Sequence, residues 1–322
     1  MKPSTSIDLK VSIGDLVLNN PVMTASGTFG YGEEFAPYGD LNHLGAVIVK
    51  GLSLEPRTGN PPPRMMETPS GMLNAVGLQN IGVRAFIREK LPFLRRFDCA
   101  VIANIYGETV EEYERVAGLL SRASGVAALE VNISCPNVRR GGIAFGAEPD
   151  AAAEVTRRVK AAAALPVMVK LTPNVTDIAQ IARAVEEAGA DAISLINTLT
   201  GMSVDVEKRI PHLANVTGGL SGPAIRPVAL RMVWQAVQAV SIPVIGVGGI
   251  LNARDALEFL IVGARAVQVG TANFIRPTVT MEIIDGISAY LERHACRSVT
   301  QIIGTLKTPE AELRRGGGGE RT

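Results

Sequence analysis

The sequence predicts an α/β fold, a single (β/α)8 barrel, and three observations lead to this prediction. Eight short apolar runs recur along the chain, with helical stretches between them. The runs are apolar on both faces, as is typical of a parallel sheet covered by helices. Eight β–α units within 322 residues fit one TIM barrel in a single domain. The expected strands are residues 22–26, 46–50, 100–104, 129–132, 167–171, 192–197, 243–248 and 266–270.

The remaining elements follow in chain order. Residues 7–11 and 16–18 flank residues 12–15 and predict an N-terminal β-hairpin at the barrel floor. Apolar side chains at helical spacing predict helices around Val110, around Ile178 and between Asn252 and Gly263. We expect Thr176 to cap the second of these helices and Gly189 to end it. A doubly wound sheet is the alternative, but its Gly-x-Gly-x-x-Gly motif is absent.

Three connections are too long for plain turns, namely residues 51–81, 135–148 and 198–222. Each follows a strand, so in a barrel all three lie at the C-terminal mouth, where long loops build active sites. We assign residues 1–309 to the barrel and expect the glycine-rich tail, residues 310–322, to be disordered.

Composition narrows the functional classes. The net charge of +1 gives no electrostatic case for nucleic acid or an acidic membrane surface, and no apolar run is long enough to span a bilayer. The three cysteines are scattered, the N-terminus has no apolar signal-peptide core, and we expect a cytoplasmic protein. There is no Cys-x-x-Cys pair, so we expect neither a metal site nor an iron–sulfur cluster in this chain.

Polar residues end most of the expected strands. An amide or charge at the end of an apolar strand costs desolvation unless it has a partner. A single such residue is explained equally well by a hydrogen bond to a loop backbone or by a ligand. Six of them at one rim favour a ligand site. The six are Ser26, Lys50, Asn104, Asn132, Lys170 and Asn197.

Glycines, rather than polar side chains, follow the last two expected strands. Gly248 and Gly249 follow strand seven, and Gly270 and Thr271 follow strand eight. Glycines let backbone N–H groups approach an anion, and these two loops are the usual phosphate site of the barrel. The alternative is that these glycines only form tight turns.

Two cations and a thiol are the reactive groups at this mouth. Lys50 or Lys170 would favour the anionic reduced form of a flavin, although either could instead serve as a Schiff-base nucleophile. The neutral asparagines around them suit a planar heterocycle better. Cys135 follows a strand end amid polar residues, and its thiolate could act as a general base.

Several motifs together resemble the dihydroorotate dehydrogenase family, and most closely its class 1B, the NAD-linked catalytic subunits of pyrimidine biosynthesis. The resemblance covers about residues 7–307, and no membrane-associating extension like that of class 2 is visible. The motifs are Lys50-Gly51, Gly59-Asn60-Pro61-Pro62-Pro63-Arg64, Asn74-Ala75-Val76-Gly77-Leu78-Gln79-Asn80, Asn132-Ile133-Ser134-Cys135-Pro136-Asn137 and Gly218-Gly219-Leu220-Ser221-Gly222.

This resemblance implies FMN at the barrel mouth and oxidation of dihydroorotate to orotate. Cys135 would remove the C5 proton while hydride leaves C6 for flavin N5. The residues implied around the flavin and ribityl chain are Ser26, Lys50, Gly51, Asn104, Asn132, Lys170, Ile196 and Gly222, and those around the phosphate are Gly248, Gly249, Gly270 and Thr271. The residues implied for the substrate are Lys50, Asn74, Ala75, Val76, Gly77, Leu78, Asn132, Asn197 and Thr198.

The resemblance also implies partners. Since the chain shows no dinucleotide motif and no cysteine cluster, a second subunit with FAD and a [2Fe–2S] cluster would pass electrons to NAD. The assembly would be α2β2 around a homodimer of barrels. Other possibilities are an FMN barrel like the pyrimidine-reducing module of dihydropyrimidine dehydrogenase, a phosphate-binding lyase or isomerase without flavin, and, least favoured, a non-catalytic scaffold.

Overall fold

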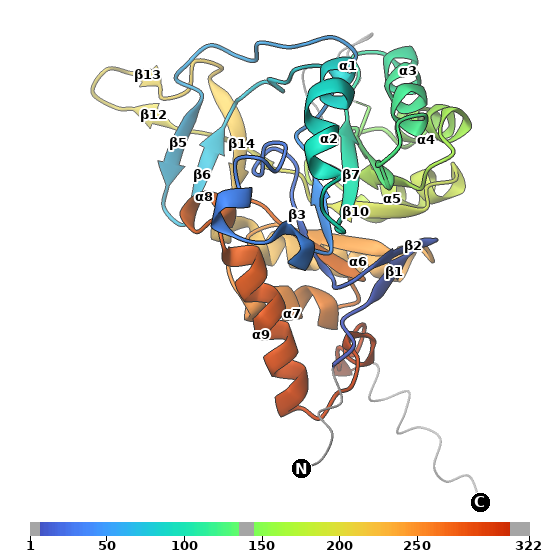
Figure 1. Cartoon of the computed structure of the whole chain (residues 1–322). Helices are drawn as coiled ribbons and strands as arrows, with labels where there is room; N and C mark the ends of the chain where they lie inside the picture. The colour runs from blue at the N-terminus through green and yellow to red at the C-terminus, as the bar shows by residue number, and fades with distance from the viewer. Residues whose placement is uncertain (1–6, 135–144, 310–322) are drawn as a thin grey trace, which may run out of the picture.

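The computed structural model describes residues 7–134 and 145–309, and its centre is a closed barrel of eight parallel strands (Figure 1). Neighbouring strands pair in chain order and the last closes on the first, which confirms the predicted barrel and rules out the doubly wound sheet. The barrel strands are β3 (Val22–Thr24), β4 (Ala46–Ile48), β7 (Ala100–Ile105), β8 (Ala128–Asn132), β9 (Val167–Lys170), β10 (Ala192–Leu195), β15 (Val244–Val247) and β16 (Ala266–Val269).

Most of these strands end earlier than predicted. Ser26, Lys50, Asn197, Gly248 and Gly270 each lie one or two residues beyond the end of their strand. The chain has already left the hydrogen-bonded ladder there. These five residues therefore belong to the βα connections at the mouth and not to the barrel wall.

Helices cover the outside of the barrel. Their bounds are α3 (Val110–Ser121), α4 (Pro149–Ala162), α5 (Ile178–Glu187), α6 (Arg226–Ala239), α7 (Ala253–Ile261) and α9 (Val279–Arg293). The prediction of Thr176 as a cap was wrong, because the Asp177 carboxylate accepts from the backbone N–H groups of Ala179 and Gln180. Gly189, at φ +95°, ends α5 as expected.

Shorter helical turns complete the shell. They are α1 (Val83–Ala85), a π-helical turn η3 (Phe86–Lys90), α2 (Leu91–Leu94), α8 (Ala272–Ile275), and four 3₁₀ turns, η1 (Ala36–Tyr38), η2 (Leu41–His43), η4 (Pro223–Ile225) and η5 (Val299–Gln301). Within the described part of the chain no helix is both long and apolar enough to cross a bilayer.

The predicted N-terminal hairpin is present as β1 (Val11–Ile13) and β2 (Leu16–Leu18). Its turn is tighter than expected, because residues 12 and 13 pair within the ladder and only Gly14 and Asp15 turn. Ile13 and Leu16 lie beside Val167 and Ala192 at the starts of two barrel strands. The hairpin therefore covers the floor, at the opposite end from the mouth.

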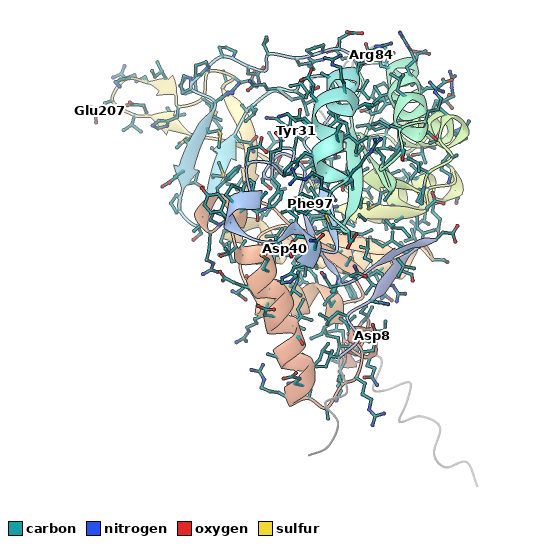
Figure 2. All side chains as sticks on the ribbon, in the orientation of Figure 1. Asp8, Tyr31, Asp40, Arg84, Phe97 and Glu207 are labelled. Atoms are coloured by element: carbon teal, nitrogen blue, oxygen red, sulfur yellow. The ribbon has the colours of Figure 1, made fainter. Side chains whose placement is uncertain are left out.

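The long connections of residues 51–81 and 198–222 are more ordered than the sequence suggested. Two of them supply an antiparallel sheet in the order β11-β14-β6-β5, which was not predicted. Its strands are β5 (Met65–Thr68), β6 (Gly71–Asn74), β11 (Leu199–Met202) and β14 (Thr217–Ser221), and a small hairpin, β12 (Val204–Asp205) with β13 (Ile210–Pro211), extends from it. Figure 1 shows this mouth sheet beside the barrel, and Glu207 in Figure 2 marks the far end of the hairpin.

Candidate active site

A cavity of about 820 Å³ opens at the C-terminal ends of the barrel strands, under the mouth sheet. Its size is in the range of cofactor and ligand pockets. All predicted binding residues within the described ranges line it, although they come from ten separate stretches of chain. These residues are Ser26, Lys50, Gly51, Asn74, Ala75, Val76, Gly77, Leu78, Asn104, Asn132, Lys170, Ile196, Asn197, Thr198, Gly222, Gly248, Gly249, Gly270 and Thr271.

Cys135, the predicted base, lies outside the described residues. The chain that leads to it is well defined, because the Ser134 hydroxyl donates to the Lys170 carbonyl at 3.0 Å and the Ser134 N–H donates to Asn132 Oδ1 at 3.2 Å. The disordered tail expected for residues 310–322 likewise falls outside the described ranges. No cluster of three potential metal ligands occurs in residues 7–134 and 145–309.

The floor of the cavity holds a buried charge cluster. Lys170 Nζ donates to Ser26 Oγ at 3.4 Å and lies 3.9 Å from Glu130 Oε2. Glu130 is fully buried on β8, and its Oε2 also accepts from Asn104 Nδ2 at 2.7 Å. The other oxygen, Oε1, accepts from Ser194 Oγ at 2.7 Å and from Gln268 Nε2 at 2.5 Å. A cation thus faces the cavity from a ring of polar groups inside the barrel.

Two amides form one wall, one at the end of β8 and one just after β10, the strands on either side of β9. Asn197 Nδ2 donates to Asn132 Oδ1 at 3.2 Å, and Asn197 Oδ1 accepts from the Thr198 N–H at 2.9 Å. The Tyr113 hydroxyl donates to the Asn132 carbonyl at 2.7 Å and so fixes the end of β8. The amide oxygens of both asparagines are thereby occupied. Within residues 7–134 and 145–309 the Asn132 amide NH2 has no partner, so it could donate to a ligand carbonyl or carboxylate.

Two more cations, Lys50 and Arg64, line the side of the cavity. Lys50 is half-buried, and its burial, followed by repulsion from the Arg64 guanidinium, lowers its pKa below the usual 10.5. Arg64 donates to the Asn60 carbonyl at 3.2 Å and to Gln79 Oε1 at 2.5 Å. Arg64 thus ties the 59–64 segment to the loop after Asn74, and both cations favour an anionic ligand between them.

The glycine-rich end of the cavity is tightly built. A Cβ at Gly248 would lie 2.7 Å from the Ala229 Cβ, and one at Gly249 would lie 2.8 Å from the Gly222 carbonyl oxygen. The α7 helix begins just beyond, capped by Asn252, whose side chain accepts from the Asp255 N–H at 3.1 Å. After β16, the strand next to β15, the Thr271 hydroxyl donates to Ser221 Oγ at 2.8 Å.

Sequence reasoning gave no role to two charged residues of this site. Glu130 lies between apolar residues in an expected strand, and a carboxylate in that position was a usable signal, because burying one requires partners. Arg64 was part of the quoted Gly59–Arg64 motif, but nothing in a single sequence indicates that its side chain faces Lys50. Cys99, just before β7, is buried, and desolvation raises its pKa to about 11.

Comparison with known proteins places these features in a family context. A family model described as "Dihydroorotate dehydrogenase" matches residues 8–291. The chain is 61% identical over 300 residues to a protein of Geotalea daltonii named "Dihydroorotate dehydrogenase B (NAD(+)), catalytic subunit", covering 93% of this chain and 98% of that one. It is 56% identical over 300 residues to the Bacteroides thetaiotaomicron protein of the same name, covering 93% and 99%.

A solved structure supports the fold independently. The crystal structure of DHODH from Eimeria tenella in complex with ferulenol superimposes with a TM-score of 0.78, covering 95% of this chain and 90% of that chain. The sequence identity is 22%, so this likeness concerns the fold.

Proposed function

The chain belongs to the dihydroorotate dehydrogenase family, and from this premise we propose that it oxidises dihydroorotate to orotate with FMN, as the catalytic subunit of an NAD-linked enzyme. The observation that supports this most is the cavity at the barrel mouth. It brings together the charged floor, the amide wall and the glycine turns. This step belongs to pyrimidine biosynthesis. A lyase or isomerase without flavin loses its support, because family membership implies a redox reaction.

The residues at the cavity fit FMN on two observations. Asn104 Oδ1 is fully buried and, among the described residues, has no hydrogen-bond partner, so a ligand N–H at the cavity floor would satisfy it. At the other end, Gly248 and Gly249 leave no room for a Cβ, so backbone N–H groups there stay open to an anion beside the start of α7. When bound, FMN would supply a hydride acceptor at the cavity floor.

The side chains around the cavity would then have separate roles in binding and proton transfer. Lys170, on the floor, would stabilise negative charge that develops on the reduced cofactor. Lys50 and the 74–78 loop would bind the substrate carboxylate and ring from the mouth, and the Asn132 NH2 would donate to a substrate oxygen. Cys135, as a thiolate, would accept the C5 proton of dihydroorotate. Loss of this proton would leave an electron pair on C5, and that pair would form the C5–C6 double bond as hydride leaves C6 for the flavin.

The first experiment is a visible spectrum of the purified protein before and after anaerobic addition of dihydroorotate. A flavin spectrum that bleaches on addition is the expected result. A protein that binds no flavin and leaves dihydroorotate unchanged would contradict the proposal. Cys135→Ala should retain the flavin spectrum but bleach roughly 10²–10⁴-fold more slowly in stopped flow, as expected for a lost acid–base group.

The phosphate site is tested at Gly270. A bulky residue at Gly249 would strain the chain by itself, because Gly249 has φ +69° and its Cβ would meet the Gly222 backbone. A Cβ at Gly270 meets only side chains at 3.5 Å and beyond, so Gly270→Ala should fold normally. We expect FMN affinity to fall at least about tenfold, or ~1.4 kcal/mol. Gly118→Ala on α3, where a Cβ also has room, is the matched control.

The electron acceptor is tested by reconstitution. Within residues 7–134 and 145–309 no cysteine pair or metal-ligand cluster could carry an iron–sulfur centre. A partner subunit with FAD and a [2Fe–2S] cluster would therefore carry electrons to NAD, in an α2β2 assembly around a barrel homodimer. The isolated chain should reduce an artificial dye with dihydroorotate but reduce NAD slowly. Equal NAD reduction with and without the partner would contradict this role.

A further inference from the structure

Glu130 is the least expected residue of the barrel interior. It is fully buried, on β8, and it has no place in the proposed chemistry of substrate or proton transfer. An unpaired carboxylate at such a position costs several kcal/mol, so its partners determine why the fold tolerates it. Those partners are Asn104, Lys170, Ser194 and Gln268, from four other strands.

The hydrogen-bond pattern around Glu130 is that of an ionised carboxylate. The amides of Asn104 and Gln268 both turn their NH2 groups toward it, and the Ser194 hydroxyl donates to it as well. As a result, Asn104 Oδ1 and Gln268 Oε1 are both buried without a partner in the described part of the chain. A protonated acid would donate its proton to one of these acceptors. All three groups instead donate hydrogen bonds to Glu130, as expected for a negatively charged carboxylate that can only accept.

The nearest cation to this charge is the one that faces the cavity. Lys170 Nζ lies 3.9 Å from Glu130 Oε2, too far for a tight hydrogen bond, and only 3.4 Å from Ser26 Oγ on the cavity side. Lys170 is therefore held between a fixed negative charge beneath it and the cavity above it. Both groups are almost fully shielded from water, so neither charge is screened by solvent.

We propose that Glu130 is a positioning residue that sets the reduction potential of the bound cofactor through Lys170. Glu130 fixes the ammonium group at the cavity floor and offsets part of its positive potential. The reduced cofactor, which gains negative charge, is then stabilised less than by an unopposed lysine. This inference rests on the proposed FMN function, and it adds a tuning residue that never touches cofactor or substrate.

The test measures the two-electron midpoint potential of bound FMN in Glu130→Gln. The amide keeps the shape and removes the charge, so the positive potential at Lys170 rises. We expect the ratio of affinities for reduced over oxidised FMN to increase about tenfold, a positive shift of roughly 30 mV for a two-electron couple. Ser194→Ala is the control, because it removes a hydrogen bond to Glu130 but retains the charge, and should leave the potential unchanged.

A double variant provides a test even if the single variant does not fold. If Glu130→Gln alone does not fold, because it leaves the Lys170 charge buried and unopposed, Lys170→Met/Glu130→Gln removes both charges. Lys170→Met should lower the potential, and the double variant should have nearly the same potential as Lys170→Met, since the charge that Glu130 opposes is gone. This coupling is the signature of action through Lys170. This comparison does not need the Glu130→Gln protein, and a double variant well above Lys170→Met would mean that Glu130 acts directly on the cofactor, which would overturn the role.

The outcomes separate the two proposals. A wild-type protein that binds no FMN would refute the proposed function. Bound FMN with an unchanged potential in Glu130→Gln, or equal shifts in Glu130→Gln and Ser194→Ala, would overturn the tuning role and leave the function standing. A positive shift in Glu130→Gln alone, coupled to Lys170 in the double variant, would support it.

Discussion

Removing the Lys170 charge should destabilise the protein strongly, even without cofactor. Lys170 Nζ and Glu130 Oε2 are 3.9 Å apart, which corresponds to an attraction of about 4 kcal/mol at an effective dielectric of 20. Lys170→Met leaves the Glu130 carboxylate buried without its cation, and such a loss typically costs roughly 3–5 kcal/mol. We expect a decrease in unfolding free energy of that size in cofactor-free protein.

The assay is urea unfolding followed by the fluorescence of Trp234, the single tryptophan. In the Lys170→Met/Glu130→Gln double variant the orphaned charge is gone, so the loss should be smaller than the sum of the single losses by about 2–3 kcal/mol. Lys208→Met is the control: Lys208 Nζ lies 3.5 Å from Asp205 Oδ2, but the Lys208 side chain is exposed to solvent and Asp205 is only partly buried. Its midpoint should not move. Strict additivity of the two buried substitutions would refute the reasoning.

Two further predictions concern titration and reactivity. Burial and Arg64 lower the pKa of Lys50, so as pH rises Lys50 loses its positive charge before an ordinary lysine would. Orotate affinity should therefore fall with rising pH, at an inflection that lies below pH 10.5. Arg64→Gln should move this inflection to higher pH, and an unmoved inflection in orotate titrations would contradict the coupling. With a pKa of about 11, Cys99 should be only ~0.1% thiolate at pH 8. Mass spectrometry after brief alkylation of native protein should therefore find Cys99 unmodified and the more exposed Cys296 modified, whereas equal labelling would contradict this.

The barrel was predictable because each strand carries its own local signal. Apolar runs bounded by helices needed no knowledge of distant contacts, and the polar residues at their ends pointed to one rim once the barrel was assumed. The mouth sheet was not predictable in this way. Its β6 and β14 pair residues such as Leu73 and Leu220, which are far apart in sequence, and Gly218 and Gly219 weaken the strand signal of β14.

The two missed charges show the same limit at the level of side chains. Arg64 matters because its guanidinium lies close enough to Lys50 to lower a pKa, and that proximity arises only when the mouth connections fold together. Glu130 matters because five strands direct polar side chains to one point inside the barrel. In the sequence, a carboxylate within an apolar strand indicates that it must have polar partners. Only the closed barrel identifies those partners. Sequence reasoning identified groups that face the cavity, but it missed the charge behind them, which the barrel surrounds with four polar partners.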